Sequence, residues 1–368
     1  MRVSPDQRIF GVLYRLEFLP ESEQMRSFLI LLVVLMAGST ASLAADHGVI
    51  LAYHHVADDT PPSTSISPAQ FRRHLEYLRD NGFTVIGLDT LISSLREGRQ
   101  LPDRAVVISF DDGYISIYEQ AFPMLQAFDY PFSLFLSTEP IDSGQRNYMS
   151  WQQIREMSDA GVVIGNHMID HPYMLEGKQG ESNQQRLQRL RQELLQAEQT
   201  ILKETGQSHR YLAYPYGEYD RPIKAMLSEL GFVGLAQNSG AVSSHSDFQA
   251  LPRFPLGSIY ANLDTARVKF EALAFDVEQV EPLSPVTGDR SPDVTLKFAP
   301  GNYNRAQLGC FANSKPIPMN WLDMDMGLVE LLPTEAYRGR RWRYICTAPD
   351  LDSRRFYWYS VQWINTGD

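Results

Sequence analysis

Between residues 48 and 260 the chain alternates short apolar runs with longer segments that carry apolar residues at helical spacing. The short runs predict strands, of which the run at 105–110, where β-branched residues are prominent, predicts a strand buried on both faces, and the longer segments predict amphipathic helices. The predicted strands are 49–53, 83–88, 105–110, 132–136, 162–165, 211–214 and 232–236. The predicted helices run from Ser67 to Asn81 and over 115–128, 151–160, 185–205 and 220–230. This repeated order predicts an α/β fold whose parallel sheet curls into a distorted (β/α) barrel of about seven strands.

The pattern changes near residue 276. Proline and glycine among polar residues predict a linker over 276–292, which separates a barrel domain at 46–275 from a region at 293–368. In that last region, turn residues divide short apolar runs that are rich in Tyr and Trp and show no helical stripe. They predict a smaller C-terminal β-sandwich domain, in which we expect most aromatic side chains to form the core, with a sugar-stacking face as the alternative.

The first 45 residues have the features of an N-terminal extension and a signal peptide. Arg26 precedes a compact apolar run at 28–36, and small residues ending in Ala44-Ala45 follow it. The run is too short to span a membrane, so we predict cleavage near Ala44 and a periplasmic or secreted protein with no membrane span. Met25 would be a suitable start for this signal. Residues 1–24 then come either from a start codon assigned too far upstream or from an untypical extension.

The formal charge of the 368-residue chain is −11. This charge argues against a nucleic-acid partner and against adhesion to anionic lipid, whereas a neutral or cationic polymer is compatible with it. We expect a monomer. The two cysteines, Cys310 and Cys346, both lie in the C-terminal region. In an oxidising compartment such a pair is more often a disulfide than a metal site, and two small core residues are the alternative.

Two adjacent carboxylates, Asp111 and Asp112, end the predicted strand 105–110 and precede Gly113. Ligands of α/β folds bind at the carboxyl ends of the strands. Neighbouring strand residues point to opposite faces, so these two carboxylates can share a site only where the strand turns into its loop. The alternative is that they cap the helix predicted at 115–128.

Two histidines, His167 and His171, follow the predicted strand 162–165. Their spacing of four residues would place both imidazoles on one face of a helical turn. With a carboxylate from another strand they would make a three-ligand site for a divalent metal that leaves positions open for water, as in catalytic zinc sites.

These segments resemble the polysaccharide deacetylases (the NodB-homology domain, carbohydrate esterase family 4), and the resemblance covers roughly residues 48–260. The first and second signatures of the family match Ser109-Phe110-Asp111-Asp112-Gly113 and His167-x-x-x-His171. The third motif is similar to Tyr214-Pro215-Tyr216-Gly217, and the opening strand of the exported poly-N-acetylglucosamine deacetylases is similar to Leu51-Ala52-Tyr53-His54.

The resemblance implies a role for each matched residue. Asp111 would be the catalytic base and His54 the general acid. The metal ligands would be Asp112, His167 and His171, with Zn²⁺ as the expected ion and Co²⁺, Ni²⁺ or Mn²⁺ as alternatives. The backbone N–H of Tyr216 would help to hold the oxyanion.

The chain also departs from the family pattern. Ala213 stands where the third motif usually has the Arg that orients the base, and Met168 stands where a Ser or Thr usually follows the first His. Arg253, which we group with Tyr216 on the oxyanion and substrate side, either reaches back to Asp111 or is an ordinary surface residue.

We therefore predict a metal-dependent hydrolase that removes N-acetyl groups from an N-acetylhexosamine polysaccharide, similar to poly-N-acetylglucosamine, outside the cytoplasm. One alternative is an O-acetyl esterase acting on a plant glycan. Another is a catalytically weak sugar-binding module that kept the fold; Ala213 favours this alternative, and the complete Asp and His sets oppose it. If neither His54 nor His55 is the acid, His245 is the next candidate.

Overall fold

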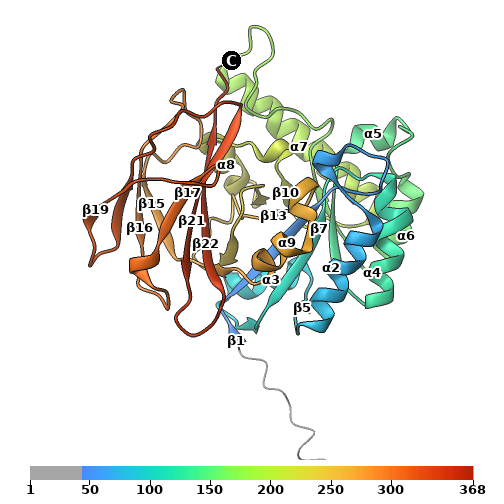
Figure 1. The fold of residues 1–368 in the computed structure, drawn as a ribbon. Helices are drawn as coiled ribbons and strands as arrows, with labels where there is room; N and C mark the ends of the chain where they lie inside the picture. The colour runs from blue at the N-terminus through green and yellow to red at the C-terminus, as the bar shows by residue number, and fades with distance from the viewer. Residues whose placement is uncertain (1–43, 368) are drawn as a thin grey trace, which may run out of the picture. The chain divides into compact units, whose positions relative to one another are not determined.

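A curled sheet of mainly parallel strands is the centre of the fold, drawn from blue to yellow in Figure 1. The computed structural model describes residues 44–367. From one edge to the other, the strands are β11 (Val233–Leu235), β10 (Tyr211–Ala213), β9 (Val163–Asn166), β8 (Phe132–Leu136), β7 (Ala105–Phe110), β2 (His47–Tyr53) and β12 (Ala241–Ser243). Each pair from β11 to β2 is parallel, and β12 is antiparallel to β2. The predicted α/β class and distorted barrel are confirmed.

Helices follow most of these strands and cover the sheet (Figure 1). They are α2 (Pro68–Asp80), α3 (Leu88–Arg96), α4 (Phe122–Phe128), α5 (Thr138–Asp142), α6 (Trp151–Asp159), α7 (Asn183–Thr205), α8 (Arg221–Glu229) and α9 (Leu263–Phe270). Local signals fix their starts: the side chain of Ser67 accepts a hydrogen bond from the Gln70 N–H at the head of α2. None of the helices within residues 44–367 combines the length and apolar character needed to cross a membrane.

Two segments differ from the sequence prediction. The strand predicted at 83–88 is only β5 (Thr84–Val85), because the apolar residues that follow it already belong to α3. The helix predicted at 115–128 begins with a π-helical turn, η2 (Ile117–Ala121), before α4. Pro123 lies in the first turn of α4 and has no N–H to donate to the carbonyl four residues earlier, which accounts for the irregular start.

The alternation of side chains along β7 decides what faces the barrel interior. Val106 and Ile108 pack outward with the apolar stripe of α2, whereas Val107 packs inward with the residues that fill the barrel. With a period of two, Ser109 and then Asp111 continue the inward row. The strand therefore delivers Asp111 to the interior at its carboxyl end.

Residues 248–255 close the gap between the edge strands. The carbonyls of Phe248 and Leu251 accept hydrogen bonds from β11 and the residue after it. A few residues later the strand β13 (Phe254–Pro255) pairs in parallel with β2. Arg253 therefore lies where the curled sheet is completed.

The C-terminal region consists of two facing sheets with an apolar core between them, drawn in orange and red in Figure 1. One sheet contains β14 (Leu273–Ala274), β22 (Phe356–Ile364), β21 (Arg341–Pro349), β17 (Gly309–Ala312) and β18 (Lys315–Pro316). The other contains β15 (Val277–Glu281), β16 (Val294–Phe298), β20 (Leu328–Leu331) and β19 (Met319–Asp323). This is the predicted β-sandwich; its core includes Trp342 and Trp363, while Trp321 and Trp358 are only partly buried.

The predicted borders of this region stay predictions, but the pairing of β15 and β14 bears on them. Strand β15 lies inside the segment 276–292 that we expected to be a linker. Strand β14, at the end of the predicted barrel domain, pairs with β22. Cys310 and Cys346 face each other across β17 and β21 and form a disulfide.

The predicted extension and signal peptide at 1–45 lie outside the described residues, except for Ala44 and Ala45. These two residues form β1 (Ala44–Ala45), which pairs antiparallel with β6 (Leu101–Pro102).

Candidate active site

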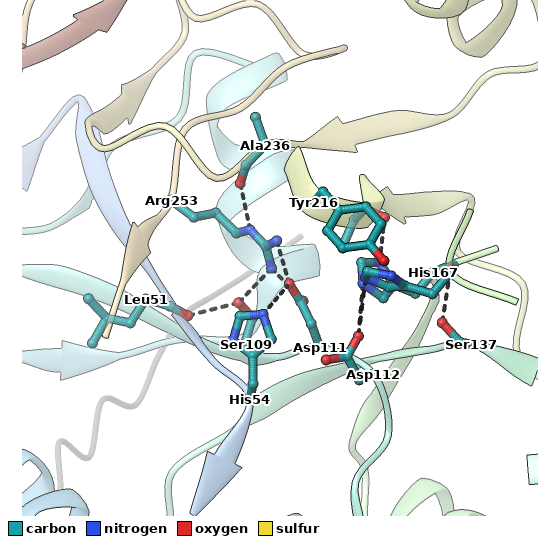
Figure 2. Close-up of polar contacts among 12 residues, drawn as sticks. Leu51, His54, Ser109, Asp111, Asp112, Ser137, His167, Tyr216, Ala236 and Arg253 are labelled. Atoms are coloured by element: carbon teal, nitrogen blue, oxygen red, sulfur yellow. Dashed lines mark hydrogen bonds and ion pairs between the residues drawn. The ribbon is translucent and has the colours of Figure 1, made fainter. Parts of the chain in front are cut away.

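Asp111 and Arg253 form a completely buried, bidentate ion pair at the carboxyl end of β7 (Figure 2). Each of the two terminal guanidinium nitrogens donates to one carboxylate oxygen at 2.7 Å. The Arg253 Nε donates to the Ala236 carbonyl at 2.9 Å, and Nη1 also donates to the Ser109 hydroxyl at 3.3 Å. Ser109 in turn donates to the Leu51 carbonyl at 2.8 Å. The guanidinium is therefore held in one orientation, and it fixes that of Asp111.

This position corrects our placement of Arg253. Its side chain has no exposed surface, so it is not a surface residue, and its donors are directed at Asp111 and protein oxygens and not at the oxyanion or substrate side. Arg253 is a positioning residue for Asp111. It supplies from the closing segment 248–255 the guanidinium that the third motif lacks at Ala213.

Burial alone would raise the pKa of Asp111, but the Arg253 guanidinium, together with the nearby His167 and His54, holds the pKa below the usual range of an aspartate. Asp111 is thus a charged, oriented carboxylate at neutral pH. This is the state that a general base requires.

Asp112 turns away from Asp111 toward the two predicted histidines. Its φ of 75° lies in the left-handed region, and Gly113 follows with a φ of 88°. A side chain at position 113 would approach Leu136 Cδ2 to 2.9 Å, so the turn requires glycine there. The Asp112 Oδ1 lies 3.2 Å from His167 Nε2 and 3.5 Å from His171 Nε2.

His167 and His171 meet at Asp112, but not through the helical turn that we expected. The segment after β9 is an irregular loop in which Met168 and His171 both have positive φ, 68° and 54°. The side chain of the buried Asn166 holds this loop. Its Oδ1 accepts a hydrogen bond from the Met168 N–H, and its Nδ2 donates to the Glu198 side chain and to the Leu194 carbonyl of α7.

The hydrogen bond of His167 at Nδ1 leaves Nε2 available to bind a metal. Nδ1 lies 2.7 Å from the Ala213 carbonyl, which can only accept, so Nδ1 carries the proton. In neutral His167, Nε2 then offers a lone pair toward a carboxylate oxygen, and it has no hydrogen-bond partner among the described residues although it is buried. Two acceptors this close need a cation or proton between them.

The set of Asp112, His167 and His171 therefore fits a divalent ion. The three ligand atoms lie within 4.8 Å of one another, and this donor set of two imidazoles and one carboxylate is typical of catalytic zinc sites. Burial lowers the pKa of His171 to about 4, so its ring is neutral and able to bind a metal at physiological pH. Burial alone would raise the pKa of Asp112, but the neighbouring histidines His167, His54 and His171 together lower it.

The neighbouring histidines His54 and His55 have different surroundings. His54 Nε2 lies 3.9 Å from Asp111 Oδ2, and its side chain keeps 16% of its surface exposed (Figure 2). His55 belongs to the short strand β3 (His55–Val56) and stacks on Tyr114 with ring centroids 3.6 Å apart. His54 is therefore the histidine that is brought to the candidate base. The further candidate His245 instead lies 3.7 Å from Asp276.

Tyr216 completes the edge of the site. It has a φ of 58° within the 3₁₀ turn η3 (Pro215–Gly217), and its ring contacts His171 edge-on at 4.3 Å. Tyr173 stacks on the other part of this ring at 3.9 Å, and Arg341 of β21 lies over it at 5.1 Å. No sequence pattern marks Tyr173 or Arg341 as supporting residues. Asn166 alone has a local signal, because it is a polar residue at a buried strand end beside the first histidine.

Comparison with known proteins identifies the domain that carries this site. Residues 98–235 match the family model described as polysaccharide deacetylase. The putative polysaccharide deacetylase YxkH of Bacillus subtilis is 26% identical over 207 residues, which cover 55% of this chain and 69% of that protein. The poly-β-1,6-N-acetyl-D-glucosamine N-deacetylase of Escherichia coli K12 is 22% identical over 242 residues, and the match spans 56% of this chain but only 36% of that longer protein.

Among solved structures, IcaB from Ammonifex degensii superimposes with a TM-score of 0.54 and 26% identity over 62% of this chain and 98% of that one. The family match includes Asp111, Asp112, His167, His171 and Ala213. The chain therefore contains a polysaccharide deacetylase domain, which makes it a hydrolase.

Proposed function

We propose that this protein is a metal-dependent N-deacetylase of an N-acetylhexosamine polysaccharide similar to poly-N-acetylglucosamine. One observation carries the proposal: a buried carboxylate, Asp111, is charged and clamped by Arg253 directly beside the metal-type set of Asp112, His167 and His171. Hydrolysis of an unactivated amide needs both a base for water and an electrophile for the carbonyl.

The roles follow from position. A divalent ion, for which we propose Zn²⁺, would lie between Asp112, His167 and His171 and supply Lewis acidity toward the acetyl oxygen and a lowered pKa for water. Asp111 takes the proton of the attacking water, because it is ionised and held by two hydrogen bonds from the Arg253 guanidinium. Its carboxylate is already oriented before the substrate binds, which is the advantage of a preorganised base.

His54 lies beside Asp111 and is partly exposed, so it can donate a proton to the nitrogen of the leaving sugar. The backbone N–H of Tyr216, in a turn held by its positive φ, is our candidate donor for the negative oxygen of the tetrahedral intermediate. Acetate then leaves, and the sugar keeps a free amine.

The position of Arg253 favours an enzyme over a catalytically weak sugar-binding module. The feature that favoured such a module was the missing arginine at position 213, and Arg253 supplies a guanidinium to Asp111 from elsewhere in the chain. A protein that only binds sugar has no need for a buried ion pair that orients a base.

The names of two relatives favour one polymer. The E. coli protein is named for poly-β-1,6-N-acetyl-D-glucosamine, and a relative from Staphylococcus epidermidis, 28% identical over 194 residues, carries the same name. We propose the same substrate class for this chain. We also propose export to the periplasm or medium, from the leader-like residues 26–45.

The test is acetate release by the zinc-loaded protein from poly-β-1,6-N-acetylglucosamine, chitin oligomers and acetylated xylan, assayed in parallel. We expect turnover of a glucosamine polymer and little acetate from xylan. Release from xylan alone would make the protein an O-acetyl esterase. Retention of a polymer without release of acetate would make it a binding module.

A further inference from the structure

A cavity lies beside the candidate active site, where loops of the barrel meet the C-terminal sheets. Its volume is about 580 Å³, within the range of sites for small molecules and single sugars. The barrel contributes Tyr260 of η4 (Ser258–Ala261) and Lys269 of α9, and the C-terminal sheets contribute Arg343 of β21 and Trp358 of β22. Tyr216 lines its edge as well.

The charge of this cavity is opposite to that of the chain. Its lining includes Lys269, Arg338, Arg341 and Arg343 and no aspartate or glutamate, although the net charge of the protein is −11. Of the four cations, Arg341 is paired, at 3.1 Å from Glu218. The other three form no ion pair within residues 44–367.

Lys269 is the most informative of these cations. Its residue surface is 8% exposed, and across the described part of the chain its ammonium has neither an ion pair nor a hydrogen bond. The ammonium instead lies over the Tyr260 ring, 4.5 Å from its centroid. Burial, and then the charge of Arg343, lower the pKa of Lys269 to about 8, so it is still mainly protonated at neutral pH.

The Lys269 side chain is largely buried and its ammonium has no counter-charge, so an anion that enters the cavity would stabilise the charged form. Arg343 is held toward the same space by a hydrogen bond to the Gln237 carbonyl at 3.0 Å. Trp358, whose Nε1 donates to Ser239 at 3.1 Å, gives the cavity an aromatic wall against which a sugar ring can pack.

The cavity and the candidate active site share Tyr216, which lines the cavity and whose ring contacts His171 at 4.3 Å. We propose that it is a subsite for an anionic substituent, a carboxylate or a phosphate, on a sugar unit next to the acetamido sugar. The substrate would then be a polysaccharide of the N-acetylhexosamine class proposed above that also carries anionic groups. This inference rests on the proposed deacetylase function.

The test compares acetate release from three polymers by the zinc-loaded full chain. One is neutral poly-N-acetylglucosamine, one alternates N-acetylglucosamine with a uronic acid, and one joins N-acetylglucosamine units through phosphate. We expect a lower KM for at least one anionic polymer. Lys269→Gln should raise that KM about tenfold, as expected for loss of a hydrogen bond to a charged group, and change the KM of the neutral polymer less than twofold.

Two further variants keep the result interpretable. Arg338→Gln removes an exposed cation of the same cavity, so it should fold normally and raise the KM of the anionic polymer about threefold. Lys224→Gln is the matched control, because Lys224 lines a neighbouring cavity of about 430 Å³ and not the proposed subsite, so it should change neither KM. A preference for only one of the anionic polymers identifies the anion as carboxylate or phosphate.

The inference is overturned if wild-type protein treats neutral and anionic polymers alike and Lys269→Gln and Arg338→Gln change neither KM; the proposed deacetylase function then still stands. If no polymer releases acetate, the proposed deacetylase function is wrong. A binding measurement then tests the anionic subsite on its own. In that case titration calorimetry of wild-type protein with the uronic acid and phosphate oligomers should show binding that weakens in Lys269→Gln but not in Lys224→Gln. Equal binding by both variants, or none by wild type, would also overturn the inference.

Discussion

At the scale of single residues, Asp111 and Arg253 show how two buried charges can hold each other in one orientation. Neither side chain has exposed surface, and each would be costly to bury alone. The bidentate geometry, with two contacts of 2.7 Å, offsets part of that cost and fixes the carboxylate at the same time. A lysine could match the charge of Arg253 but not its planar fork.

Arg253→Met should therefore reduce both stability and activity. It keeps the approximate volume but leaves Asp111 buried without its counter-charge, so the free energy of unfolding should fall by about 3–5 kcal/mol. The pKa of Asp111 should rise, and the acidic limb of the pH–rate profile should move to higher pH. Urea denaturation and a pH profile of acetate release measure the two effects.

Asp111→Asn combined with Arg253→Met provides the control for this pair. The double variant should be less destabilised than Arg253→Met alone, because it no longer buries an unpaired carboxylate. A single Arg253→Met variant with wild-type stability and an unchanged pH profile would contradict the positioning role.

His54 and His55 give a second comparison at this scale. Without a general acid the amine must leave unprotonated, which is difficult for an amide and easier for an ester with a good leaving group. His54→Ala should therefore lower N-deacetylation at least a hundredfold, as is usual for the loss of acid–base catalysis, and largely spare an activated aryl acetate. His55→Ala should mainly lower the melting temperature, because it removes the stacked contact with Tyr114. The opposite pattern would show that His55 is the acid.

At the scale of secondary-structure elements, the sequence predicted the strands that carry the site better than the loops that shape it. Apolar runs and the end of each strand were sufficient to bring Asp111, Asp112 and His167 to one edge of the sheet. The helical turn predicted for His167 and His171 was wrong, because spacing alone does not reveal a loop with two left-handed residues. The contact of Arg253 with Asp111 depends on how the sheet closes over 248–255, which no local pattern determines.

Helix α2 carries a buried histidine that makes the fold sensitive to acid. His74 has no exposed surface, accepts a hydrogen bond from the Tyr53 hydroxyl at Nδ1 and donates from Nε2 to the Ala261 carbonyl. Burial lowers its pKa from 6.5 to about 4. Between these values the unfolded chain binds a proton that the folded chain does not, so the free energy of unfolding falls as the pH decreases.

By pH 4, the neutral, buried state of His74 should have lowered the free energy of unfolding by on the order of 3 kcal/mol, since one pKa unit corresponds to about 1.4 kcal/mol. His55 and His171, with pKa values also lowered to about 4 by burial, add in the same direction. His74→Gln should reduce the slope of stability against pH in denaturant titrations between pH 6.5 and 4, while the exposed His245→Gln should not. An unchanged slope in His74→Gln would contradict a neutral, buried His74.

At the scale of the whole chain, the site is assembled from segments that are distant in sequence. The candidate acid follows β2, both carboxylates follow β7, the histidines follow β9, and the arginine lies just before β13. The C-terminal sheets also take part, because Arg340 and Arg341 bind the buried Glu218 directly after the turn of Tyr216. The β-sandwich thus supports one wall of the candidate site, a role that its sequence did not reveal.

The most direct test of the account measures acetate release and metal content on the same samples of wild type, Asp111→Asn and His171→Ala. We predict that the wild type binds one divalent ion and deacetylates poly-N-acetylglucosamine. Asp111→Asn should keep the metal and lose activity at least a hundredfold, the usual scale for loss of a general base. His171→Ala should lose tight metal binding and remain folded. Stoichiometric metal in His171→Ala, or loss of metal together with activity in Asp111→Asn, would contradict the assignment of base and ligands on which the account depends.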